Sequence, residues 1–212
     1  MMYLSKTAAL TIGVTALAVS LIGGIQPAMA GPASTGPPAV AAVQPAIPDA
    51  ALLQPEDLGG APTTEVTDDY WDSLRPPQPC ADRPYGSAAL RRADRAVSAM
   101  IGFEDRPTVI VNDVAVYRAD GAQLYLRELR RHVASCDGWT VVAGRTDSVL
   151  LRHREYIDYA EVYKNTYVMV ARVGRVLVTV ADTGWETGSG HEALVRDLGK
   201  VAVQRAAVAN RK

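Results

Sequence analysis

The clearest hydrophobic period in the chain covers residues 120–135, where leucine and valine positions recur at helical spacing and arginines fill the positions between them. This one-sided pattern is typical of an amphipathic helix that packs on a core. Asp120 is placed to cap the start of the helix, and Gly138 follows its end. A second helix with one apolar stripe is predicted from His191 to about Ala209, with Ser189 as the capping residue.

Between these helices the chain consists of short segments rich in Val, Tyr and Thr, which predict β-strands. Thr108–Tyr117 is the strongest of them. Arg95–Ile101 fits either a strand or a helix, with the strand favoured, and Ala88–Ala93 is compatible with the start of a helix. Five more strands are predicted at Trp139–Ala143, Ser148–Arg154, Ala160–Tyr163, Thr166–Arg172 and Arg175–Ala181.

The short connections between these strands favour antiparallel pairing, with a hairpin turn centred on Val173-Gly174. We therefore expect an α+β fold in which one antiparallel sheet packs against two main helices that form one layer. The domain is expected to span residues 49–210. Within it, the proline-rich segment 61–87 is expected to be irregular, with Tyr70 and Trp71 folded back onto the core.

The first thirty residues have the features of a secretory signal peptide. Lys6 precedes an apolar run of about 18 residues from Ala8 to Ile25, and Ala28 and Ala30 fit a signal-peptidase site before Gly31. The run is also just long enough to remain as an uncleaved membrane anchor, which is the alternative. Cleavage predicts a secreted, extracellular protein that is not anchored in the membrane.

Residues 31–48 contain mainly proline, alanine and other small residues with no charge, a composition that predicts a flexible spacer. The charges of the chain are nearly balanced, because residues 1–30 hold one lysine and no acid and the remainder holds 21 basic and 23 acidic residues. This balance gives no reason to expect nucleic acid or an anionic membrane surface as a partner.

The two cysteines, Cys80 and Cys136, are expected to form one disulfide in an oxidising compartment. By the loop-entropy model a bridge of this span stabilises the fold by about 4 kcal/mol. The three histidines, His132, His153 and His191, show no metal-ligand spacing with the cysteines, so neither a metal nor another cofactor is predicted.

No catalytic motif is recognisable. The sequence Gly188-Ser189-Gly190 lacks the pattern of a nucleophile elbow, and the histidines belong to three separate elements. We therefore predict a protein that is not an enzyme. Convergence of His153 or His191 with a carboxylate and a nucleophile would reverse that prediction.

Four tyrosines lie within twelve residues and are the first candidates for a ligand cleft: Tyr156, Tyr159, Tyr163 and Tyr167. On a strand, Tyr159, Glu161 and Tyr163 would share one face, and an aromatic row beside a carboxylate suits a small polar or cationic ligand. Cross-strand packing of tyrosines on a half-exposed sheet face is the more ordinary use of such a pattern.

The order of these features resembles a family of exported sensor-like domains of actinobacteria. Residues 52–60, LLQPEDLGG, are similar to the family's "LLTxxDLGG" opening, and a β segment at 109–117 then leads to the helix that ends in Cys136-Asp137-Gly138-Trp139. A strand pair, 167–172 and 175–180, precedes the last helix. The domains in question are the extracellular sensor region of PknH-type mycobacterial serine/threonine kinases and related free-standing lipoproteins.

The resemblance implies an α+β domain with an antiparallel sheet, disulfides and a cleft whose ligand is unknown. The family pattern has two disulfides, whereas this chain has one cysteine pair, and with no kinase domain any signalling would need a separate partner. We accordingly expect a monomeric, non-catalytic sensor-like domain that binds a small ligand at the cell envelope or outside the cell. The alternative is a structural or protein-interaction module of the envelope.

Overall fold

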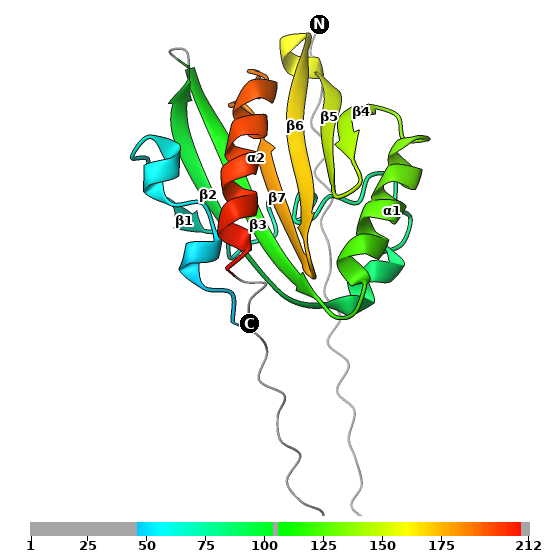
Figure 1. Cartoon of the computed structure of the whole chain (residues 1–212). Helices are drawn as coiled ribbons and strands as arrows, with labels where there is room; N and C mark the ends of the chain where they lie inside the picture. The colour runs from blue at the N-terminus through cyan, green and yellow to red at the C-terminus, as the bar shows by residue number, and fades with distance from the viewer. Residues whose placement is uncertain (1–45, 104–105, 209–212) are drawn as a thin grey trace, which may run out of the picture. The chain divides into compact units, whose positions relative to one another are not determined.

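Seven antiparallel strands form one sheet in the order β1-β2-β3-β7-β6-β5-β4 (Figure 1). The computed structural model describes residues 46–103 and 106–208. The strands are β1 Thr64–Glu65, β2 Arg91–Phe103, β3 Arg106–Tyr117, β4 Trp139–Arg145, β5 Ser148–Ile157, β6 Val162–Val173 and β7 Val176–Asp182. The predicted signal peptide at residues 1–30 and most of the predicted spacer lie outside the described residues.

Two α-helices and four short 3₁₀ helices accompany the sheet within the described residues. They are η1 Asp49–Ala51, η2 Pro55–Leu58, η3 Gly86–Leu90, α1 Gly121–Val133, η4 Asp158–Ala160 and α2 Glu192–Ala206. No helix in this part of the chain is both long and apolar enough to span a membrane.

The sheet has a hydrophobic core on each of its faces. On β3, Val111 and Ala115 pack in the core that includes α1, whereas Ile110 and Val114 pack in the core that includes α2. We call these surfaces the α1 face and the α2 face. The predicted α+β fold with one antiparallel sheet and two main helices is confirmed, but the prediction of a single helical layer is wrong. The central strand β7 is buried along its whole length, as expected for a strand that is covered on both sides.

Two strand predictions change in the structure. The segment Arg95–Ile101 is part of a strand, β2, which begins at Arg91, so Ala88–Ala93 does not start an α-helix. The two strands predicted at Ala160–Tyr163 and Thr166–Arg172 are one strand, β6, because the turn lies earlier, in η4, and Glu161 has a positive φ of 55°.

The ends of the elements also differ in detail from the predictions. Asp120 occupies the N-cap position of α1 without a side-chain capping bond. Ser189 does not cap α2, since its hydroxyl accepts a hydrogen bond of 2.9 Å from the backbone N–H of Asn165 on β6. Ile47, in the predicted spacer 31–48, is buried in the α2-face core, so the packed chain begins before residue 49.

The predicted disulfide is present between Cys80 and Cys136, with an S–S distance of 2.01 Å. It joins the irregular segment between β1 and η3 to the chain just after α1. The same segment contributes Leu74 and Tyr85 to the α1-face core, with Trp71 packed against that core, so the sequence expectation for Trp71 is confirmed. The same expectation for Tyr70 is wrong, because its side chain is 73% exposed.

Candidate functional site

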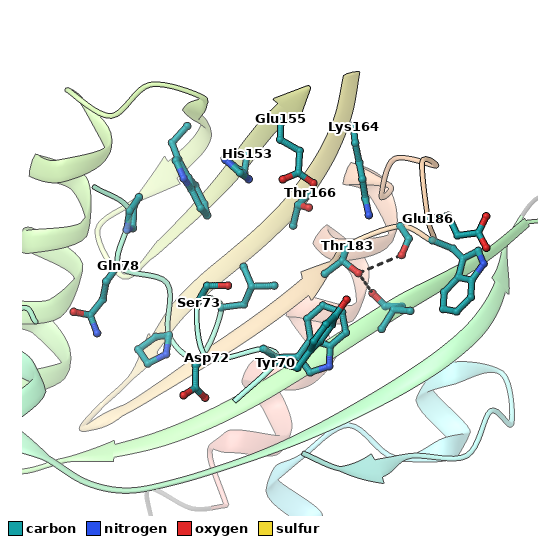
Figure 2. A pocket seen from close by; sticks show the side chains of 18 of the residues that line it. Tyr70, Asp72, Ser73, Gln78, His153, Glu155, Lys164, Thr166, Thr183 and Glu186 are labelled. Carbon is teal, nitrogen blue, oxygen red and sulfur yellow. Dashed lines mark hydrogen bonds between the residues drawn. The ribbon is translucent and has the colours of Figure 1, made fainter. Parts of the chain in front are cut away.

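A cavity of about 820 Å³ opens on the α1 face of the sheet, and three parts of the chain form its walls (Figure 2). The first wall is the irregular segment 70–79, which we call the cover segment. The second is the end of strands β4, β5 and β6 together with η4, and the third is the connection from β7 to α2, residues 183–186. In Figure 2 the strand residues His153, Glu155, Thr166 and Lys164 lie opposite Tyr70 and Ser73 of the cover segment.

All three tryptophans of the chain line this cavity. Trp71 comes from the cover segment, Trp139 from β4 and Trp185 from the β7–α2 connection, so each wall supplies one indole ring. Tyr70 lies edge-on to Trp71, with ring centroids 4.5 Å apart, and Trp185 is 41% exposed. Aromatic side chains stabilise a fold most when they are buried. Three indole rings around an open cavity therefore indicate a surface that is suited to binding.

Polar groups of both kinds lie among these rings. On the sheet, Glu155 is directly opposite Lys164, and His153 is directly opposite Thr166, in the antiparallel register of β5 and β6. His153 stacks on Trp139 with ring centroids 4.7 Å apart. Burial lowers the pKa of His153, with Glu155 acting in the opposite direction, so the neutral imidazole is favoured.

The cover segment is held in place by buried polar contacts. The Tyr125 hydroxyl of α1 donates a hydrogen bond to the carbonyl of Pro77, and the Gln78 side chain accepts one of 2.8 Å from the backbone N–H of Tyr85. Arg75 reaches down to the sheet, where its guanidinium lies 3.7 Å from Asp94 and 4.0 Å from Asp113. This wall of the cavity is therefore fixed to both α1 and the sheet.

Asp113 is fully buried under the cover segment, and neither of its carboxylate oxygens has a hydrogen-bond partner. Desolvation raises its pKa to about 7; Asp94 and Asp72 also raise it, while Arg75 and Arg91 lower it. The sequence placed Asp113 on a strand face without any sign that this face is closed there. The polar pair Asn112-Asp113 inside an otherwise apolar strand is the signal that could have indicated a buried charge.

A second buried carboxylate, Asp182, organises the β7–α2 connection. It accepts hydrogen bonds of 2.8 Å from the backbone N–H groups of Gly184 and His191, and it lies 3.1 Å from Nδ1 of His191. Gly184 has a positive φ of 64°, and a Cβ there would lie 1.9 Å from the carbonyl oxygen of Gly188, so only glycine fits. This turn positions Trp185 at the cavity. The sequence pattern predicted a role for neither Asp182 nor Trp185.

The predicted tyrosine row is divided between the two faces of the sheet. Tyr159, in η4, lines the cavity. Tyr156 and Tyr163 are cross-strand partners with ring centroids 5.0 Å apart, on the opposite side of the strands from His153 and Thr166. The shared strand face predicted for Tyr159, Glu161 and Tyr163 is therefore wrong, because residues 158–161 form a turn.

Tyr167 follows Tyr163 on the same side of β6, which is the α2 face, and Glu161 lies in the turn. Of the five predicted site residues, only Tyr159 is among those that line the cavity. Ligand binding by the other four, Tyr156, Glu161, Tyr163 and Tyr167, stays a prediction.

The three histidines stay apart. His132 stacks on Tyr85 and His153 stacks on Trp139, whereas the His191 ring is tilted by 49° against Phe103 and faces Asp182. Among the described residues, His, Cys, Asp and Glu side chains form no group of three that could hold a metal ion. The side chains that line the cavity can stack on a ligand and can form hydrogen bonds and ion pairs with it.

Comparison with known proteins gives one informative structural match. The fold is similar to the crystal structure of the extracellular domain of PknH from Mycobacterium tuberculosis, with a TM-score of 0.50 and 13% sequence identity over 77% of this chain and 94% of that domain. No family model matches the sequence, and no curated protein matches it. The match shows that the chain shares the fold of that extracellular domain.

Proposed function

We propose that this protein is a non-catalytic, ligand-binding domain of the sensor type that acts at the cell envelope or outside the cell. The observation that carries the proposal is the cavity of about 820 Å³ on the α1 face, which is lined by all three tryptophans of the chain. A large cavity with aromatic walls and a few polar groups has the features of a small-molecule site.

The fold and the disulfide support the extracellular part of the proposal. The similar solved domain is an extracellular one. The Cys80–Cys136 bridge fits an oxidising compartment, as does the signal peptide predicted at residues 1–30. An unknown small ligand in the cavity would contact the cover segment, the sheet and the β7–α2 connection at the same time. We propose that a separate envelope protein recognises the ligand-bound form of these segments.

Native mass spectrometry of the full chain, purified from the envelope or medium of its host, tests the proposal. We expect a small molecule that is retained by the wild-type protein and lost from the double variant Trp71→Ala/Trp185→Ala. Tyr156→Ala is the matched control, because it removes an aromatic ring on the other face of the sheet. Retention of the same molecule by all three proteins would contradict a site in the cavity.

The second candidate is an envelope protein-interaction module, and one observation favours it. Tyr156 and Tyr163 are 48% and 56% exposed on the α2 face, and the Arg154 guanidinium lies 3.7 Å from the Tyr163 ring centroid. Exposed tyrosine and arginine side chains are typical of protein interfaces. In the same experiment, a protein complex that Tyr163→Ala disrupts and the tryptophan variant does not would support this candidate instead.

A further inference from the structure

The charge of the cavity restricts the ligand that the proposed function calls for. The ionisable side chains in its lining are three carboxylates, from Asp72, Glu155 and Glu186, one lysine, Lys164, and the histidine His153. Because the neutral form of His153 is favoured, the lining carries more negative than positive charge. Arg75 offsets one of these carboxylates, because its guanidinium lies 3.5 Å from Asp72, and the lining then has no surplus of positive charge that could hold a phosphate, sulfate or carboxylate group. An anionic ligand is therefore disfavoured.

A cationic ligand is disfavoured for a different reason. The Asp72 carboxylate lies 3.5 Å from the guanidinium of Arg75, and Glu155 is directly opposite Lys164 in the sheet register. Two of the three carboxylates thus have a positive side chain beside them, and a cation bound near Glu155 would meet the Lys164 ammonium. An aromatic cage for an ammonium ion needs rings and acceptors without such a competing charge.

What remains is a neutral ligand with many hydroxyl groups and apolar faces. Gln78, Ser73, Thr166 and Lys164 donate hydrogen bonds, while Glu155 and Glu186 accept them, and a sugar hydroxyl does both. The C–H faces of a pyranose ring are flat and apolar, and they pack well on indole rings. Trp71, Trp139 and Trp185 offer such surfaces on three separate walls.

The size of the cavity agrees with more than one sugar ring. Its volume of about 820 Å³ lies toward the upper end of the range of roughly 300–1,000 Å³ found for small-ligand sites. We propose, on the basis of the proposed function, that the cavity binds a neutral oligosaccharide, with the tryptophan rings stacking on successive sugar rings. The ligand class is a saccharide free of phosphate, sulfate and carboxylate groups.

The test uses the full chain on an array of neutral and charged glycans, followed by titration of the best neutral glycan in solution with tryptophan emission as the readout. Because every tryptophan of the chain lines the cavity, bound saccharide should shift and quench the emission. Trp185→Ala should weaken binding about tenfold or more, as for a central aromatic contact, and Trp185→Phe should restore part of it.

Matched controls keep the result interpretable. Tyr163→Ala, an exposed aromatic on the α2 face, should leave the dissociation constant unchanged, and circular dichroism should show that the Trp185 variants are folded. Trp185 is 41% exposed in a connection, so its truncation does not open the core.

Two negative results would overturn the saccharide proposal and are distinguishable from failure of the proposed function. The first is binding confined to phosphorylated, sulfated or uronate glycans, or a response only to choline and spermidine added as cationic probes. The second is that no neutral glycan binds, while native mass spectrometry still shows a retained molecule that depends on Trp71 and Trp185. If no retained molecule is found either, the proposed function fails as well.

Discussion

The two faces of the sheet are covered in different ways. The cavity of about 820 Å³ lies on the α1 face, whereas the hollows beside α2 are smaller, at about 490–520 Å³ each. On the α2 face, helix α2 and the residues around η1 and η2 form a continuous apolar core, and Arg205 near the end of α2 pairs with Glu56 and Asp57 of η2. On the α1 face, helix α1 covers one part, and the irregular cover segment spans the other part above the cavity.

The difference teaches where a binding function can be placed without weakening the fold. A regular amphipathic helix packs its apolar stripe closely on the sheet, and the hollows along its edges are the smaller ones. An irregular segment has no such stripe, so it must be fixed by individual contacts, here the disulfide, the Arg75 ion pairs and the Tyr125 hydrogen bond. The four predictions below test this contrast.

The largest effect is expected from removal of the disulfide, which secures only the α1-face cover. The double variant Cys80→Ser/Cys136→Ser should lose about 4 kcal/mol of unfolding free energy in urea, because the bridge closes a span of 56 residues. Dithiothreitol should destabilise the wild type by a similar amount and leave the variant unaffected. A loss below about 1 kcal/mol would show that the cover segment is held by its other contacts.

The second effect concerns the buried Asp113. Its pKa in the folded protein is about 7, above the ordinary value of 3.8, so folding favours the protonated acid. The stabilisation is therefore complete below about pH 4 and is lost as the pH rises through 7. Asp113→Asn should remove this loss, and its stability advantage over the wild type should grow on the order of 3 kcal/mol between pH 4 and pH 8.

Asp147→Asn is the matched control, because the Asp147 side chain also pairs with an arginine, Arg172, but it is 54% exposed and is not among the charges that act on Asp113. Urea titrations at several pH values should show that the difference in unfolding free energy between this control variant and the wild type changes much less between pH 4 and pH 8. Equal profiles for the two variants would contradict the assignment of the pH dependence to burial on the α1 face.

The third effect probes the close packing between β7 and the start of α2. A Cβ at Gly190, where the chain enters α2, would lie 2.2 Å from the backbone carbonyl oxygen of Asp182 on β7, so Gly190→Ala should cost about 1–3 kcal/mol through overpacking. Gly102→Ala is the control, since a Cβ there meets nothing within 4 Å. Thermal unfolding of both variants gives the comparison, and equal midpoints would mean that the start of α2 can shift away from β7 without cost.

Much of the fold could be predicted from the sequence because it follows from local pattern. The periodic apolar stripe gave α1, the β-branched runs gave most of the strands, and the cysteine count gave the bridge. The layer of each helix could not be predicted, because both stripes are apolar in the same way. The faces depend on how the chain crosses from β3 through α1 to the edge strand β4, and on the side to which α2 turns after β7.

The candidate site could be predicted much less well. The tyrosine row between 156 and 167 pointed to the right pair of strands, but a short turn at 158–161 changed which side chains share a face. The tryptophans lie 68 and 46 positions apart along the chain, and three separate segments bring them together. No local sequence pattern shows that these segments meet. The buried contacts of Asp113 and Asp182 could not be predicted for the same reason, because they depend on tertiary packing.

The smallest effect compares two exposed tyrosines from one hairpin. Tyr163 packs against Tyr156 and Arg154 on the α2 face, so Tyr163→Ser should cost about 0.5–1.5 kcal/mol for the lost aromatic contact. Tyr159 is 82% exposed at the cavity, and Tyr159→Ser should change the unfolding free energy by less than about 0.5 kcal/mol. Urea denaturation of the two variants measures the difference. If Tyr159 contributes as much to stability as Tyr163 does, the ring belongs to the packing of the fold; if it contributes nothing, the ring is free to contact a ligand in the cavity.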